Sequence, residues 1–586
     1  MKLALVSIHI DHSLRAIPLG TAMLAAAVEK DLGEQVNTTL IDCTLQQSVT
    51  DCAKEILRHQ PDIVGLSITV WNRELALDIA HHLKSANPNL ILLAGGPEAT
   101  ANPLSLEEIV DLDFVLTGEG EQKVITFLGN LLQGQAPKPS ELMAVESIPD
   151  LGDLPSPYLT GMLRPTPGGG VLWELSRGCP YRCDFCFESR GSAIVRRFPL
   201  QRARAELQLF ASLGVREVFV LDPTFNYHKQ TAKELLGIMA KEGQGLHYSL
   251  EIRAELLDHE LAELFASIDC SLQIGLQSAD AKVLRMINRD FDREEFTDKV
   301  HLLHLAGVSY GFDLIYGLPG DSLAGFLASL DFALGLIPNH LDIFPLAVLP
   351  GTRLADTATG LGLEYQQHAP YKVRSSNTFT SAEITQAARI GAACDFFYNR
   401  GRAVPWFAMV LDGLDLVPSE FFSRLASVLP EIPPDDPLPL QQSFVADQFK
   451  QRQQPEVAAL ASDLIAYFGA VEPLLRDPVF KAPSGLKAGE LYLNPDSVFV
   501  TFNYDPEQLL QHLADGITDL EELTFFAEPV NSEYCCYLYQ DELQLYPLTR
   551  EQGDFLKSLD SHTPAEPPSA KFVAKVLEAG MLIQAR

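Results

Sequence analysis

The chain has 586 residues, which is too long for one hydrophobic core, and a length of roughly 150 residues per domain predicts three or four folded units. Hydrophobic residues make up 47% and charged residues 21%, which argues against a mainly disordered protein. The chain holds 77 acidic and 44 basic side chains, giving a formal net charge of -33. Because such a surface repels phosphate backbones, we expect a small molecule or peptide as partner and no nucleic acid.

The N-terminal stretch MKLALVSIHIDHS has one lysine and a short apolar run that Asp11 and His12 interrupt. It predicts a first strand and no signal peptide. No apolar run approaches the roughly 20 residues that span a bilayer, so we expect a cytoplasmic protein without a membrane partner. Thiols stay reduced in that compartment, where clustered cysteines more often bind metal or do chemistry than form disulfides.

Short β-rich runs alternate with helical patterns over residues 1–135. Five strands separated by helices predict an N-terminal doubly wound parallel sheet. Sheets of this kind bind ligands at the carboxyl ends of their strands. The candidate contacts are Ser67 and Thr69 after the third strand, Gly95, Gly96 and Pro97 after the fourth, and Gly118, Glu119, Gly120 and Glu121 after the fifth.

A second alternating region, residues 171–351, follows a linker over residues 136–170 that is rich in Pro and Gly. Its six βα units predict a partial (β/α)6 barrel, shorter than the roughly 250 residues of a full eight-unit barrel. We expect a mostly helical domain over residues 352–475 and a small α+β domain over residues 476–586. The predicted fold class is therefore α/β, with two smaller units after the barrel.

Three of the nine cysteines, Cys179, Cys183 and Cys186, are spaced C-x3-C-x2-C directly after the first barrel strand. Barrels of this kind collect their chemistry at the carboxyl ends of their strands. Three thiolates on one loop suit a soft metal centre, and a four-iron cluster held by three cysteines leaves one iron without a protein ligand. A zinc knuckle would need a fourth ligand that no nearby Cys or His supplies, and a disulfide would leave one thiol over.

This spacing, with Phe185 just before the third cysteine, resembles the radical S-adenosylmethionine superfamily. In that family the open iron binds the amino and carboxylate groups of S-adenosylmethionine. An electron from the cluster then cleaves the sulfonium and gives a 5'-deoxyadenosyl radical. The resemblance implies a [4Fe-4S] cluster on the three cysteines and S-adenosylmethionine as a second cofactor.

Later strand ends, LEIRAEL, LQIGLQSADAKVLRMINR and FDLIYGLPGDS, look like those of the branch that shares features with oxygen-independent coproporphyrinogen oxidase. By that resemblance Arg253 pairs with the methionyl carboxylate, and Glu251 accepts from the amino group or the ribose. The alternative is that such residues satisfy buried strand ends or shape turns. The expected S-adenosylmethionine contacts are Phe185, Glu251, Arg253, Gln277, Ser278 and Gly317.

The first domain resembles the cobalamin-binding domain that precedes the radical barrel in one large subgroup. The matching stretches include AIPLGTAMLAAAVEK and DFVLTGEGEQKVITFL. The cobalt-ligating signature D-x-H-x-x-G is absent, as it is from many members of the subgroup. The resemblance implies that Ser67, Thr69, Gly95 and Gly96 hold the displaced nucleotide tail, whereas a vestigial domain would serve only as scaffold.

Together these resemblances imply a cobalamin-dependent radical S-adenosylmethionine enzyme that methylates an unactivated carbon, with flavodoxin or ferredoxin as electron donor. One alternative is cyclisation, rearrangement or oxidation without methyl transfer. Methylthiolation of transfer RNA would share the same domain order, but the charge of -33 and the missing basic C-terminal module argue against it. A non-catalytic redox or ligand sensor is the alternative of another class. The sequence names neither a substrate nor a catalytic residue.

Overall fold

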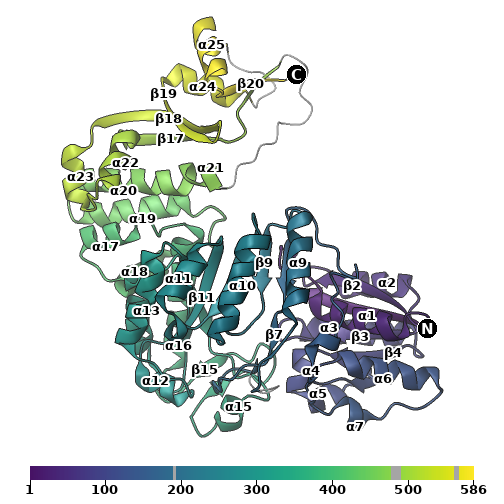
Figure 1. Cartoon of the computed structure of the whole chain (residues 1–586). Coiled ribbons are helices and arrows are strands. Elements are labelled where there is room, and N and C mark those ends of the chain that lie inside the picture. Colours follow the sequence, from purple (N-terminus) through teal and green to yellow (C-terminus); the bar gives the residue numbers. More distant parts are fainter. Residues whose placement is uncertain (189–192, 477–489, 560–565, 586) are drawn as a thin grey trace. The chain divides into compact units, whose positions relative to one another are not determined.

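A computed structural model describes residues 1–188, 193–476, 490–559 and 566–585 (Figure 1). The chain divides into two compact units, one formed by residues 1–338 and 342–388 and the other by residues 339–341 and 389–586. The expected boundary at residue 352 is therefore not where the chain divides, because residues 352–388 pack with the barrel. The expected boundary at residue 476 adjoins residues 477–489, which lie outside the described residues.

The first sheet is five-stranded and parallel, with the order β2-β1-β3-β4-β5, and helices follow its strands as the alternating pattern predicts. Ser48 caps one of these helices by accepting a hydrogen bond from the backbone of Asp51. The elements are β1 Lys2–His9, α1 Leu19–Leu32, β2 Asn37–Thr44, α2 Val49–Arg58, β3 Ile63–Ser67, α3 Arg73–Ala86, β4 Ile91–Gly95, α4 Pro97–Ala101, α5 Pro103–Glu107, β5 Phe114–Val115 and α6 Glu121–Leu132.

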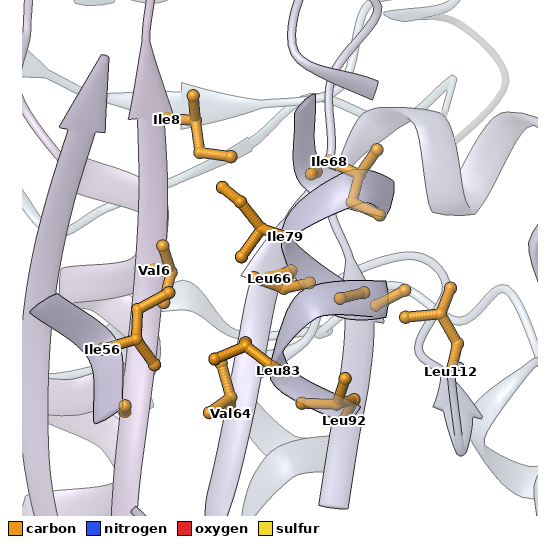
Figure 2. Packing of buried hydrophobic residues seen from close by; sticks show 14 of the residues in the cluster. Val6, Ile8, Ile56, Val64, Leu66, Ile68, Ile79, Leu83, Leu92 and Leu112 are labelled. Carbon is orange, nitrogen blue, oxygen red and sulfur yellow. The ribbon is translucent and has the colours of Figure 1, made fainter. Parts of the chain in front are cut away.

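Hydrophobic side chains fill both faces of this sheet. On one face, side chains from β1, β3 and β4 meet those of α2 and α3, and Figure 2 shows Val64, Leu66 and Leu92 beside Ile79 and Leu83. On the other face, α1 and α6 cover the strands with Val28, Phe127 and their neighbours. Burying side chains of this size stabilises the fold by about 1.5–3 kcal/mol each, and both faces hold many of them.

The linker carries two short helices, α7 Pro139–Leu142 and η1 Leu151–Asp153. The second sheet is six-stranded with the order β13-β12-β11-β10-β9-β6, which is that of an open barrel formed from consecutive βα units. Its elements are β6 Gly170–Trp173, α9 Leu200–Ser212, β9 Glu217–Val220, α10 Lys229–Glu242, β10 His247–Ile252, η2 Ala254–Leu256, α11 His259–Ala266, β11 Cys270–Gln277, α12 Ala281–Met286, α13 Arg293–Leu305, β12 Ser309–Tyr316, α14 Leu323–Gly335 and β13 His340–Pro345.

The first barrel strand begins against the first domain. A Cβ atom added at Gly170 would lie 2.4 Å from the carbonyl oxygen of Leu14, which belongs to the loop between β1 and α1. In the same loop the guanidinium of Arg15 lies 4.6 Å from the ring centre of Phe219 on β9. The residue at position 170 must therefore be glycine if this loop is to approach the strand.

Residues after the barrel close the first unit with α15 Arg353–Thr357, β14 Glu364–Tyr365 and β15 Val373–Ser375. Helix α16 begins in the first unit and ends in the second, which continues with further helices; two of the helices run into π-helical turns. These elements are α16 Ser381–Cys394, η3 Asp395–Arg400, α17 Phe407–Leu414, α18 Pro418–Val428, α19 Leu438–Gln451, α20 Pro455–Ala466, η4 Tyr467–Val471 and α21 Pro473–Arg476.

The second unit also holds an antiparallel sheet, β17-β18-β19, and a two-stranded one, β16-β20. Two helices between the first two long strands, α22 and α23, were not predicted from the sequence. The elements are β16 Leu491–Leu493, β17 Ser497–Tyr504, α22 Pro506–Ala514, α23 Leu520–Phe526, β18 Pro529–Tyr539, β19 Glu542–Leu548, α24 Arg550–Ser558, α25 Ala570–Glu578 and β20 Leu582–Gln584.

Within the described residues, one helical run, Pro455–Leu475, is long and apolar enough to cross a membrane by length and composition, with a mean hydropathy of 1.4. The expectation that no run approaches that length therefore needs this correction. Half of its apolar window is buried inside the protein, and its Asp463 accepts hydrogen bonds from the backbone of Asn503 and Tyr504. These contacts are typical of a core helix in a globular unit.

Candidate functional site

The cysteine-bearing loop leaves the barrel through a narrow neck. The two-residue strands β7 (Ser176–Arg177) and β8 (Arg196–Arg197) pair antiparallel on either side of it. Asp222, after β9, holds the entrance, since its carboxylate accepts from the backbone N–H groups of Leu175 and Ser176 at 3.0 and 2.9 Å. It also accepts from the Ser176 hydroxyl at 2.7 Å. Residues 189–192 of the loop lie outside the described part.

The three loop cysteines are free thiols, with Cys179 buried and Cys183 and Cys186 half-buried. The backbone N–H of Cys186 donates to the carbonyl of Cys183 at 3.1 Å, which makes a tight turn between them. Burial raises the pKa of Cys186 to about 12 and also raises the pKa of Cys179, and the neighbouring cysteines add to both effects. The thiols therefore lie near enough to one another to interact electrostatically.

Among the described residues, no three His, Cys, Asp or Glu side chains gather in the geometry of a metal-ion site. Zinc draws its ligands to within about 2.3 Å of one centre. An iron–sulfur cluster takes one thiolate per iron, so its ligands stand farther apart than those of a single ion. Three unbridged thiols on one loop fit such a cluster.

Arg289 is a residue near the cysteines that the sequence did not single out. It follows α12, its guanidinium donates to the Gly275 carbonyl, and it lies near enough to Cys183 to interact with that thiol electrostatically. Burial lowers the pKa of Arg289. Its stretch, VLRMINR, was interpreted only as part of the strand end that contains Gln277 and Ser278. Nothing in the sequence shows that Arg289 lies near the cysteine loop.

Arg253, at the carboxyl end of β10, lies beside the cysteine loop. Its guanidinium lies 3.7 Å from the ring centre of Tyr181 and forms an ion pair with Glu255. Its backbone is held by buried Asn226, which donates to the Arg253 carbonyl at 2.9 Å and accepts from its N–H at 3.0 Å. Asn226 was missed because an asparagine in a loop carries no motif.

Glu251 lies on β10 opposite Gln273 of β11. Its side chain is accessible to solvent, but many protein atoms lie around it. This combination is expected of a group that lines a recess. Burial raises the pKa of Glu251 to about 7, with contributions from Asp313 and Glu188. Gln273 donates to Asp313 at 2.6 Å, so carboxylates and an amide line the inner face of the barrel here.

The other predicted S-adenosylmethionine contacts lie in different settings. Phe185 is half-buried, and Gln277 is buried with a left-handed backbone (φ 67°) at the end of β11. The hydroxyl of Ser278 is fully buried and bonds to Ser329, which turns it toward α14. Gly317 has φ 86°, and a side chain there would strike Val373.

The carboxyl edge of the first sheet has buried hydroxyl groups without hydrogen-bond partners. They belong to Thr44 at the end of β2, Thr69 after β3 and Thr117 after β5. Such groups favour a ligand that supplies the missing bonds, since an unpaired buried polar group costs about 1–3 kcal/mol. Ile10 and Trp71 are 58% and 50% exposed at the same edge. Polar and apolar groups together fit a large ligand such as cobalamin.

The remaining predicted contacts of this edge are held by the protein itself. Ser67 accepts through its carbonyl from Asn72 at 3.0 Å, and the N–H of Gly118 donates to Thr100 at 2.9 Å. Gly95 ends β4, and Gly96 has φ 98°, where an added Cβ atom would lie only 2.7 Å from the Ile68 carbonyl oxygen. Glu119 is engaged by two arginines of the barrel unit, Arg177 and Arg196, and both lie far from it in sequence.

A cavity of about 520 Å³ lies between α1, α6 and the linker, and Glu119 is among the residues that line it. Lys30 and Lys123 line it, and both donate to backbone carbonyls, Lys30 to that of Asp153 at 2.7 Å. Because these cations are already bonded within the protein, we assign no ligand to this cavity.

Comparisons with known proteins agree with this arrangement. The model of the B12 binding domain matches residues 12–127, and that of the radical SAM superfamily matches residues 173–333. An uncharacterized methyltransferase, PH0819 of Pyrococcus horikoshii, is 27% identical over 404 residues, covering 64% of this chain and 86% of that protein.

A second relative is the cobalamin-dependent radical SAM methyltransferase TokK of Streptomyces tokunonensis, 28% identical over 343 residues. That match covers 50% of this chain and 48% of TokK, so it spans about half of the relative. Among solved structures, the cobalamin-dependent S-adenosylmethionine radical enzyme OxsB with aqua-cobalamin bound has a TM-score of 0.54 at 14% identity, with 82% of each chain covered. At that identity the likeness concerns the fold.

Proposed function

Because this chain belongs to the radical S-adenosylmethionine enzymes that carry a cobalamin-binding domain, we propose that it methylates an unactivated carbon of a small molecule or peptide. The proposal rests above all on one observation. Three free thiols on the loop after the first barrel strand belong to the same compact unit as a sheet edge with unpaired hydroxyls. Methyl transfer by this chemistry needs both sites in one molecule.

The cofactors are those of the family, a [4Fe-4S] cluster, S-adenosylmethionine and cobalamin. When bound, they supply the electron, the radical and the methyl carrier. In our proposal Cys179, Cys183 and Cys186 hold the cluster. Thr69 and Thr117 bond to cobalamin, because their hydroxyls are buried and lack partners.

Within the barrel, we propose that Arg253 and Glu251 hold S-adenosylmethionine by its carboxylate and amino groups. The stacking of Arg253 on Tyr181 fixes the guanidinium plane beside the cysteine loop, which favours a forked contact with a carboxylate. Glu251, whose pKa is about 7, is the stronger acceptor for the N–H groups of that amine when it is ionised. The acidic inner face of the barrel also suits the positive charge of a sulfonium.

The test starts from protein isolated without oxygen from cells supplied with cobalamin, in which iron and cobalamin are measured first. The protein is then incubated with a strong reductant and S-adenosylmethionine bearing a deuterated methyl group, in the presence of extract fractions. We expect deoxyadenosine, S-adenosylhomocysteine and a deuterated product to form together. Deoxyadenosine without S-adenosylhomocysteine would instead support cyclisation, rearrangement or oxidation. A protein that binds cofactors and never cleaves S-adenosylmethionine would overturn the enzyme proposal and favour a sensor.

We further propose a cytoplasmic enzyme that receives electrons from flavodoxin or ferredoxin, since these carriers suit a low-potential cluster. To test the proposed electron donor, the purified chain is cross-linked to flavodoxin or to ferredoxin, and the rate of cluster reduction is measured. A rate no faster than that with dithionite alone would contradict this donor.

A further inference from the structure

Two arginines oppose each other across the neck of the cysteine loop. Arg177 on β7 and Arg196 on β8 are direct partners in the antiparallel ladder. Their side chains are only 13% and 11% exposed. Like charges placed opposite each other in a ladder are destabilising, and burial reduces the screening by water. Without a counter-charge, the repulsion between the two arginines would push β7 and β8 apart.

Carboxylates from the first domain neutralise the two arginines. Glu119 accepts from Arg196 Nη1 at 2.9 Å through Oε2, and Arg177 Nη1 lies 3.6 Å from the same oxygen. Glu121 accepts from Arg177 Nη2 at 2.7 Å. Although burial opposes ionisation, bonds from Arg196 and the Ile148 backbone lower the pKa of Glu119, so it is charged at neutral pH. We call Arg177, Arg196, Glu119 and Glu121 the neck clamp.

The barrel contributes one acid of its own to this group. Glu174 accepts from Arg177 at 2.9 and 3.0 Å through its two oxygens. Glu174 does not lie between the arginines, since the bonds described for it go to Arg177, whereas Glu119 reaches both. The carboxylate that relieves the opposition therefore comes from the other domain.

We propose that the neck clamp positions the cluster loop against the cobalamin domain and so sets the separation of the two cofactors. The proposal rests on the function proposed above. Arg177 is two residues from Cys179 in the chain, and Glu119 directly follows Gly118 at the carboxyl edge of the first sheet. The connection between the two cofactor sites is thus short and charged, and the linker joins it through the Ile148 backbone, which donates to Glu119 at 2.8 Å and accepts from Arg196.

The far end of the loop is also close to the first domain. A Cβ atom at Gly351, on the loop after β13, would lie 2.9 Å from the Phe187 ring and 3.1 Å from the carbonyl oxygen of Ala101 on α4. The backbone of Leu354 donates to the carbonyl of Asp184 at 2.8 Å. The cysteine loop is therefore held at its neck and also at its far end. If the neck is loosened, the loop can rotate about the contacts at its far end.

The test measures the magnetic coupling between the reduced cluster and cob(II)alamin by pulsed EPR, in full-length protein whose iron and cobalamin contents are known. Glu119→Gln keeps the shape of the side chain and removes its charge. We expect a weaker and broader coupling than in the wild-type protein. In cofactor-free protein we expect faster amide hydrogen exchange over residues 177–187. The matched control is Lys84→Met, which breaks the ion pair with Asp113 inside the first domain and should change neither measurement.

The double variant Glu119→Gln/Arg196→Met distinguishes positioning by charge from a loss of packing. Removing the opposed cation relieves the repulsion, so hydrogen exchange at the neck should return toward the wild-type rate. A double variant no better than Glu119→Gln would overturn the proposal, as would unchanged coupling and exchange in Glu119→Gln. If the wild-type chain binds neither cofactor, the proposed function fails, and with it the role of the clamp in spacing the cofactors. The exchange measurement would then report only on the neck.

Discussion

Asp222 carries a prediction whose size follows from its surroundings. Its carboxylate is 5% exposed, and burial raises its pKa to about 6 from the ordinary 3.8, although Ser176 and two backbone N–H groups donate to it. An acid whose pKa is higher in the folded state binds its proton more tightly there. Its ionisation therefore lowers the free energy of unfolding as the pH rises from the unfolded pKa through the folded one. The full loss, at about 1.4 kcal/mol per pKa unit, is about 3 kcal/mol.

Asp222→Asn removes that loss and keeps an acceptor of the same shape. We expect the variant to be more stable than the wild-type protein by about 3 kcal/mol at pH 8, and by about half of that at pH 5. Because a chain of two units does not unfold in one step, the measurement is the opening free energy of β6 and β9 from amide hydrogen exchange.

Asp222→Ala is the matched control, since it removes the charge and the acceptor together. It leaves two N–H groups without their bonds and should be less stable than Asp222→Asn by about 2–6 kcal/mol. If Asp222→Asn is less stable than the wild-type protein at pH 8, the three donors outweigh burial and the reasoning is refuted.

Three further predictions concern the cofactors. Cys183→Ala should lose bound iron and all formation of deoxyadenosine, whereas Cys52→Ala, in the core of the first domain, should keep both; a fully loaded Cys183→Ala would rule out the cluster assignment. Because ionised Glu251 is a stronger acceptor for the amino N–H groups than protonated Glu251, KM for S-adenosylmethionine should fall as the pH rises through about 7 and stay level in Glu251→Gln; parallel pH profiles would count against this contact. Thr117→Val should leave the stability of the cofactor-free protein within about 1 kcal/mol and weaken cobalamin binding about tenfold, measured by titration, and unchanged affinity would exclude Thr117 as a contact.

The alternation of strands and helices could be predicted because each strand of a parallel sheet is a short apolar run. The five strands of the first domain and the six of the barrel lie where such runs occur. Helices α22 and α23 were missed, although Asp505 before Pro506 is a recognisable helix start. Both are short, and they lie between two long strands of the small α+β unit, in a segment for which the sequence predicted no element.

The cysteines could be predicted because their spacing is local in the sequence. The residues that hold the neck of the cysteine loop could not be predicted. Arg177 and Glu121 are 56 residues apart, and Arg196 and Glu119 are 77 apart. No periodicity links such residues, because only the packing of one domain against another brings them together. Glu119 shows the consequence: it lies at the edge where a ligand contact was expected, and its charge is used by two arginines of the barrel.

The glycine at the start of β6 limits how this architecture can be recombined. Position 170 leaves no room for a side chain because the loop that contains Leu14 lies over it, and Arg15 of that loop rests on Phe219. A chimera that takes residues 1–135 from another member of the family would replace this loop while keeping the strand beneath it. Grafts therefore need to exchange the loop and the first barrel strands together. The two sides of this contact must come from the same protein, even though they belong to different domains.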